Sequence, residues 1–280
     1  MIVASLGIAF GAIFSSGMME VARKGIFVPG EFYFNEIMII FLAVMITDIL
    51  LLDFFNTLGM PTSTTVSIVF ELLGAAVAMA LIKIGADNGS FSDVVNYINT
   101  EKATQIILGI LLSVVVAFSV GAIVQYISRV LLSFDFEKKA KWVGAVFGGF
   151  ALAAITYFIF IKGLKGTDYY ANIKPMIEGR TLLIISISFV VWSLLSYLAV
   201  VVLKWNIYKI IIIIGTFALA LAFAGNDLVN FIGVPIAAWQ SYEAWVVSGI
   251  PATEFSMEVL ASKVPTPTYL LLAAGLVMVL

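Results

Sequence analysis

The sequence contains no cysteine and no histidine, and only 11% of its 280 residues are charged. Without cysteine there is no disulfide, no thiolate metal site and no cysteine nucleophile. Without histidine there is no imidazole to ligate a metal, to relay protons or to act as a general base. The formal net charge of −2 provides no basic surface for nucleic acid. These absences exclude the commonest catalytic centres and nucleic-acid binding.

Apolar residues make up 62% of the chain, and the mean hydropathy is +1.12. Soluble proteins carry about 45–50% apolar and about 25% charged residues. The excess indicates that much of the surface faces lipid, and apolar runs near the bilayer-spanning length of about 20 residues recur. The composition predicts an all-α, polytopic transmembrane bundle, which we expect in a plasma (inner) membrane. Met1 leads directly into apolar sequence, which favours a membrane span over a signal peptide.

The apolar runs predict a series of spans. They lie at about 1–19, 36–55, 66–83, 104–133, 142–162, 180–203 and from 207 to a break at 225–227, followed by an interrupted segment at 233–250 and a last run from Thr268. The last run has thirteen residues, too few to cross a bilayer about 30 Å thick. We therefore expect the protein to continue beyond this run.

Charged loops predict the orientation of the middle spans. Lysine predominates at 134–141 and 204–209, whereas the loop at 84–102 is mainly acidic. The positive-inside rule places the first two loops in the cytoplasm and the third outside. The three spans between them agree with this assignment. The topology of residues 1–65 stays open, because a re-entrant segment there would change the count.

A first polar stretch runs from Asp53 to Thr65. It contains Gly59, Pro61 and four consecutive hydroxyl residues that begin at Thr62. Non-helical backbone at membrane depth persists only where protein or a water-filled cavity covers it. Hydroxyls at a helix start, with the positive end of the helix dipole, form an anion site. The alternative is a capped loop at the membrane surface.

A second polar stretch, from Ala224 to Pro235, contains Asn226, Asp227 and Asn230. An acid in an apolar context needs a partner, and intramembrane acids are candidates for function. The alternative is an ordinary loop between two helices. Interrupted segments in two halves of a chain are a sequence indicator of a transporter site.

At these residues the sequence resembles the inorganic phosphate transporter (PiT) family, whose members symport phosphate with sodium or protons. Residues 226–233, N-D-L-V-N-F-I-G, resemble the second copy of the family's duplicated G-A-N-D-x-x-N-x-x-G signature. Residues 61–68, P-T-S-T-T-V-S-I, resemble the first copy of its P-x-S-T-T-H-S-I signature. Residues 23–26, R-K-G-I, are similar to a basic patch of the family.

The sequence departs from the family pattern at several points. Ala224-Gly225 reverses the family's Gly-Ala, and Val66 stands where the family usually has histidine. Neither the first Asn-Asp motif nor the second Ser-Thr-Thr motif is present. The resemblance therefore implies part of an inverted-repeat transporter. Residues 1–134 would be the remainder of the N-terminal repeat, and residues 135–280 would be linking spans and the start of the C-terminal repeat.

The resemblance also implies roles for individual residues. The hydroxyls of the first motif would bind inorganic phosphate near the midplane, the Asn-Asp pair would bind phosphate or a cation, and Asn230 would support that shell. The implied phosphate-binding residues are Ser63, Thr64, Thr65, Asn226 and Asp227.

Both polar stretches lack Lys and Arg, so a bound anion needs dipoles, hydroxyls and a co-bound cation. Oxygen-only ligands suit a hard cation such as sodium. We expect sodium more than proton coupling because histidine is absent, although a buried carboxylate can also carry a proton. No cofactor is expected beyond bound sodium ions.

Further polar residues are candidates for coupling-ion or supporting positions. Thr62 precedes the helix start, and Glu71 lies six residues past Thr65, where it faces either the cavity or a packing contact. Asp53 and Asp48 lie in the second span, as supporting groups or as helix-packing or interfacial groups.

Alternative functions stay open at this point. One is a secondary transporter or channel for another small anion or an amino acid. An integral-membrane enzyme would need a metal held by Asp53, Glu71 and Asp227, and we expect no enzyme. A homo-oligomer is compatible with the sequence.

The resemblance makes a prediction about the neighbouring coding sequence. An Asn-Asp motif is expected before Met1 and a Ser-Thr-Thr motif after Leu280, because the family signatures are duplicated. Sequencing the flanking DNA tests this. Absence of both motifs would contradict the phosphate assignment.

Overall fold

The structure is a computed structural model, and its regular elements are helical within the residues that it describes, apart from two isolated β-bridges. This confirms the predicted all-α class. The described residues are 1–14, 25–132, 140–160, 179–261 and 268–279.

Five described helices have the length and composition to cross a bilayer. Each satisfies its own backbone hydrogen bonds, as a segment in hydrocarbon must. They match the predicted runs at 36–55, 66–83, 104–133, 142–162 and 180–203 and confirm a multi-pass membrane protein. These helices are α2 (Phe34–Thr57), α3 (Thr64–Ala86), α5 (Thr100–Leu132), the stretch Lys141–Phe158 that includes α7 (Ala145–Phe158), and α9 (Thr181–Val201).

Some predicted features fall partly or wholly outside the described residues. The described part of the first predicted span is α1 (Ile2–Phe14), and residues 15–19 lie outside. The basic patch at 23–26 is described only from Gly25, and the lysine-rich loop at 134–141 only from Ala140. The orientation predicted from that loop stays a prediction.

The chain divides into two units, and each is described by itself. Unit 1 comprises Met1–Ser16, Val114–Asn226 and Thr268–Leu280, and unit 2 comprises Gly17–Ser113 and Asp227–Pro267. The units therefore alternate along the sequence. The predicted division at residue 134 concerns sequence repeats and stays a prediction.

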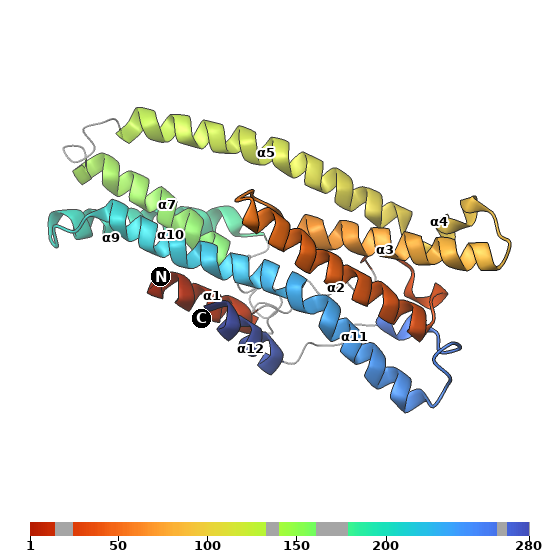
Figure 1. The fold of residues 1–280 in the computed structure, drawn as a ribbon. Coiled ribbons are helices and arrows are strands. Elements are labelled where there is room, and N and C mark those ends of the chain that lie inside the picture. The colour runs from red at the N-terminus through yellow and green to blue at the C-terminus, as the bar shows by residue number, and fades with distance from the viewer. Residues whose placement is uncertain (15–24, 133–139, 161–178, 262–267, 280) are drawn as a thin grey trace. The chain divides into compact units, whose positions relative to one another are not determined.

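In unit 1, α1 packs against α10 (Ile207–Phe223) and α12 (Thr268–Val279), and α7 packs against α9 (Figure 1). Small residues allow the close approach of α1 to α10. A Cβ atom at Gly11 would collide with the backbone carbonyl of Leu221 and lie 2.9 Å from the Ala224 Cβ. Helix pairs in membranes commonly associate through such small residues.

In unit 2, α2 and α3 form an antiparallel hairpin that packs against α11 (Val229–Ser248) (Figure 1). The two helices share a continuous buried core, which α11 joins through Val234 and Ala237. Ile37, Phe41, Leu72 and Ala76 are among its fully buried members.

One end of the hairpin is fixed by Lys83, near the end of α3. Its Nζ lies 3.0 Å from Glu36 Oε2 at the start of α2 and donates to the Glu31 carbonyl at 2.8 Å. It also lies 4.3 Å from the centroid of the Tyr33 ring.

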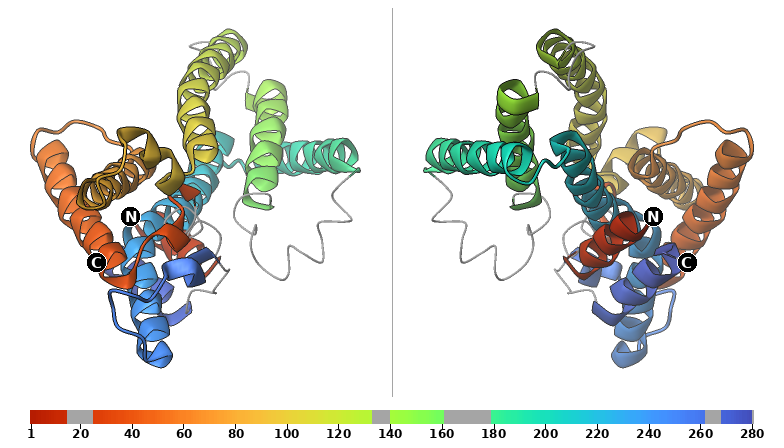
Figure 2. Two further views of the ribbon diagram at one scale, coloured as in Figure 1. Left: turned by 90° about the vertical axis from the view of Figure 1, so that its right-hand side faces the viewer. Right: turned by 90° about the vertical axis from the view of Figure 1, so that its left-hand side faces the viewer.

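The same end is closed by short turns, among them η2 (Pro29–Glu31) and η7 (Met257–Ala261), which lie side by side (Figure 2). Loop 84–102 contributes η3 (Phe91–Asp93) and α4 (Val94–Tyr97). The opposite end of the hairpin is the connection between α2 and α3.

The predicted break of the helix at 225–227 is wrong, because the backbone stays helical there and changes only its hydrogen-bonding pattern. Residues Ala224–Leu228 make a π-helical turn, η6, and α11 then continues through Gly233 and Pro235. An unwound backbone would leave polar groups unpaired at several kcal/mol each, whereas a π turn keeps the chain helical. Membrane helices tolerate an internal proline for the same reason, because local adjustments restore the lost partner.

The first predicted break is shorter than expected. Helix α2 continues through Asp53 and ends only at Thr57, so the non-helical part is confined to residues 58–63. Helices α2 and α3 have 24 and 23 residues, and each is long enough to span a bilayer.

The glycine contact in unit 1 gives a stability prediction. Gly11→Ala is expected to destabilise the protein by about 1–3 kcal/mol, because the new methyl group has no space beside α10. Thermal unfolding in detergent measures the effect. Gly109→Ala is the matched control, since nothing lies within 4 Å of a Cβ there. Equal melting temperatures for the two variants would contradict the packing described.

Candidate functional site

The connection between α2 and α3 carries the hydroxyl motif. Gly59 has a left-handed φ of 64°, which reverses the chain after α2, and Ser63 is the N-cap of α3. Ser63 Oγ accepts from the Val66 N–H at 3.4 Å, and the Ser63 carbonyl accepts from the Ser67 N–H at 3.0 Å. The predicted helix start within the hydroxyl run is confirmed.

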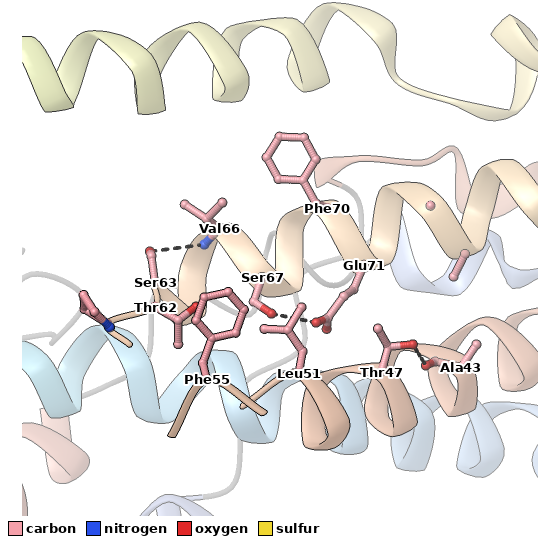
Figure 3. A pocket seen from close by; sticks show the side chains of 13 residues that line it. Ala43, Thr47, Leu51, Phe55, Thr62, Ser63, Val66, Ser67, Phe70 and Glu71 are labelled. Atoms are coloured by element: carbon pink, nitrogen blue, oxygen red, sulfur yellow. Dashed lines mark hydrogen bonds between the residues drawn. The ribbon is translucent and has the colours of Figure 1, made fainter. Parts of the chain in front are cut away.

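A cavity of about 680 Å³ lies along α2 and α3 from this connection (Figure 3). Helix α2 contributes one stripe of residues four positions apart, and α3 contributes the facing turns. The lining residues are Ala43, Thr47, Leu51, Phe55, Pro61, Thr62, Ser63, Val66, Ser67, Phe70, Glu71, Gly74 and Ala75.

The cavity is polar at two levels. Thr62 and Ser63 are exposed hydroxyls at the mouth of the hairpin, whereas Glu71 lies eight residues along α3 from Ser63. At 1.5 Å per residue this separation is about 12 Å, close to half the thickness of a bilayer. Among the described residues, the lining includes no Lys or Arg.

Glu71 interacts with Ser67 one turn before it. Ser67 Oγ donates to Glu71 Oε1 at 2.6 Å, and both side chains lie on the side of α3 that faces α2 (Figure 3). Glu71 Oε2 is buried and has no hydrogen-bond partner among the described residues. Asp48, on α2, is only 2% exposed, and its Oδ1 lies 3.5 Å from Ser67 Oγ.

The structure brings some predicted residues together. Thr62, Ser63 and Glu71 line one cavity, and Thr64 and Thr65 form the half-buried first turn of α3. Asp53 is exposed and lies two residues from both Leu51 and Phe55, on the opposite face of α2 from the cavity.

The second predicted motif is described only as backbone. Asn226 and Asp227 lie in the π turn η6, and Asn230 lies in the first turn of α11. Their side chains lie outside the described part of the structure, so their roles stay predictions. A π turn is rare and often marks a functional position in a helix.

Ser67 was not among the predicted site residues, although the sequence contains a signal for it. Ser63, Ser67 and Glu71 are spaced four apart, so they occupy one face of a helix that begins at the hydroxyl motif. Asp48 belongs to another helix, and its position beside Ser67 required the packing of α2 on α3.

The cavity makes a prediction about accessibility. The chain has no native cysteine, so single cysteines can be introduced without background. Thr62→Cys is expected to react rapidly with a water-soluble methanethiosulfonate reagent, because Thr62 is exposed at the cavity mouth. Leu72→Cys, on the fully buried face of α3, is the control and should stay unmodified. Equal labelling rates would contradict this arrangement.

Comparison with known proteins gives three curated archaeal relatives, all named provisionally as phosphate permeases. The protein of Pyrococcus furiosus is 25% identical over 271 residues, which cover 94% of this chain and 58% of the relative. Those of Pyrococcus horikoshii and Pyrococcus abyssi are each 26% identical and also align over 94% of this chain. They are covered over 59% and 60% of their length, respectively. The chain thus spans about three-fifths of these relatives.

A solved structure described as a sodium-dependent phosphate transporter has a similar fold, with a TM-score of 0.63 and 18% identity. The match covers 99% of this chain and 64% of that protein. The sequence profile of the Phosphate transporter family matches residues 1–280, that is, the entire chain. On this evidence the chain belongs to the Phosphate transporter family, as its two motifs had indicated.

Proposed function

We propose that this protein transports inorganic phosphate across a plasma membrane in symport with sodium. One observation carries the proposal: a cavity joins the hydroxyl-rich start of α3 to an acidic residue deeper in the hairpin, with no basic residue among its described lining. Family membership supports phosphate as the substrate.

The hydroxyl end of the cavity suits an anion. Thr62 and Ser63 present hydroxyl groups to the cavity, and Thr64 and Thr65 follow at the first turn of α3. The positive end of the helix dipole lies at the same place and stabilises a bound anion. Phosphate oxygens would accept hydrogen bonds there without a cationic side chain.

The Glu71 carboxylate, at the deeper end of the cavity, repels a bound anion. Two unit charges 12 Å apart repel by about 1.4 kcal/mol at an effective dielectric constant of about 20, which is about tenfold in affinity. A cation that binds together with phosphate offsets the negative charge of Glu71 and so removes this loss of phosphate affinity. The charges of the cavity therefore support cation symport.

The second signature motif would complete the phosphate site. In the proposal, Asp227 and Asn226 bind phosphate or the cation, and Asn230 supports them, as the resemblance implies. Residues 1–134 and 135–280 would then belong to the two repeats of an inverted-repeat transporter.

Phosphate uptake by full-length protein in proteoliposomes tests the substrate. Ser63→Ala and Asp227→Asn are expected to reduce uptake at least tenfold, because each removes a proposed ligand. Asp87→Asn makes the same chemical change as Asp227→Asn at an exposed position beyond the end of α3, and it should transport like wild type.

Competition and ion replacement complete this test. Excess arsenate should inhibit phosphate uptake, and excess sulfate should not. Replacing sodium by choline should abolish uptake. Uptake that ignores arsenate would contradict the substrate, and uptake driven by a pH gradient without sodium would contradict the coupling ion.

A further inference from the structure

We infer that Asp48, Ser67 and Glu71 form a sodium-binding site, here called the hairpin cation site, within the α2–α3 hairpin. Two of its three members, Asp48 and Glu71, lie outside the signature motifs, whereas Ser67 belongs to the hydroxyl motif at 61–68. The inference rests on the proposed function for its role in coupling, but not for the binding itself.

The first argument is a shortage of hydrogen-bond donors. Ser67 has a single hydroxyl proton, and its 2.6 Å contact shows that this proton is directed to Glu71. The 3.5 Å separation from Asp48 is too long for a hydroxyl hydrogen bond, which is about 2.5–3.0 Å. Asp48 is almost fully buried, yet this long contact is its only side-chain donor contact among the described residues.

The second argument is the unpaired oxygen of Glu71. Oε2 is buried and has no hydrogen-bond partner among the described residues. Two acidic side chains in contact with one serine oxygen thus both have unused acceptor capacity. Natural structures rarely leave buried acceptors unpaired, and exceptions commonly mark an unseen ion or water.

The third argument is charge. The contacts with Ser67 Oγ place Asp48 Oδ1 and Glu71 Oε1 within about 6 Å of each other. Two carboxylates at this separation repel one another, and the described lining of the cavity offers no Lys or Arg to compensate. Acidic residues inside a membrane need a positive partner, which here has to come from solution.

The chemistry of the donors selects the ion. Carboxylate and hydroxyl oxygens are hard ligands, and the described cluster contains no nitrogen or sulfur ligand. Glu71 lines the same cavity as the exposed residues Thr62 and Ser63, so an ion that enters past these hydroxyls can reach it. Phosphate and sodium would then occupy two levels of one cavity, and each would offset the charge of the other.

Sodium binding to the full-length protein in phosphate-free detergent solution tests the inference. The probe is sodium chloride titrated against potassium chloride at constant ionic strength, and the readout is the thermal unfolding temperature. Sodium is expected to raise this temperature for wild type, because a ligand of the native state stabilises it. Glu71→Gln and Asp48→Asn should weaken the apparent sodium affinity about thirtyfold or more.

Controls separate loss of the site from loss of the fold. Both variants should unfold near the wild-type temperature in potassium alone, and Asp87→Asn should retain the wild-type response to sodium. If either variant is unfolded in potassium, Ser67→Ala replaces it, with weakened sodium affinity expected. Ser63→Ala should lose phosphate uptake but keep the sodium response.

The outcomes distinguish this inference from the proposed function. Wild-type sodium affinity in folded Glu71→Gln and Asp48→Asn would overturn the hairpin cation site even if phosphate transport is sodium-driven. A response to pH in place of sodium, lost in Glu71→Gln, would identify a proton as the occupant and also overturn it. Sodium binding that depends on Glu71 in a protein that moves no phosphate would uphold the site and refute the proposed function.

Discussion

The structure depends on one constraint: in hydrocarbon, every backbone polar group needs a partner from the chain itself. This constraint explains the long apolar helices and the short connections of the α2–α3 hairpin. It also explains why Ala224–Leu228 forms a π turn and does not unwind. Where the hydrogen-bonded pattern must begin anew, at Ser63, a serine hydroxyl caps the exposed backbone.

The absence of water from the hydrocarbon region also makes the buried acidic side chains candidates for ion binding. At a protein surface, Asp48 and Glu71 would be solvated and unremarkable. Between two bilayer-length helices both lie beside one serine hydroxyl, which donates its proton to Glu71, and their remaining acceptors favour a cation. The hydroxyl-rich start of α3 has the opposite requirement, because a helix start attracts negative charge. A cavity that joins the two suits an anion and a cation together.

Most helices of the fold were predictable from the sequence, and the exceptions have physical causes. Run lengths identify α2, α3, α5 and α9 within a few residues, because lipid fixes the length of a span. The start of α3 was predictable because hydroxyl residues favour the N-cap position. The continuation of α11 through Pro235 was not, since proline and glycine predict breaks by local preference while membrane packing overrides that preference.

The site was predictable only in part. Ser63, Ser67 and Glu71 share a helix face by spacing alone, so their proximity is implicit in the sequence. The contact of Asp48 with Ser67 depends on how α2 packs against α3, and no local pattern determines this. The exposure of Asp53 on the opposite face of α2 depends on the same packing.

Simultaneous measurement of phosphate and sodium fluxes in proteoliposomes tests the central claim most directly. An inward sodium gradient should drive phosphate accumulation, and added phosphate should accelerate sodium entry in a fixed ratio. Glu71→Gln should lose both fluxes together. Phosphate accumulation at the wild-type rate without accompanying sodium entry would contradict the account.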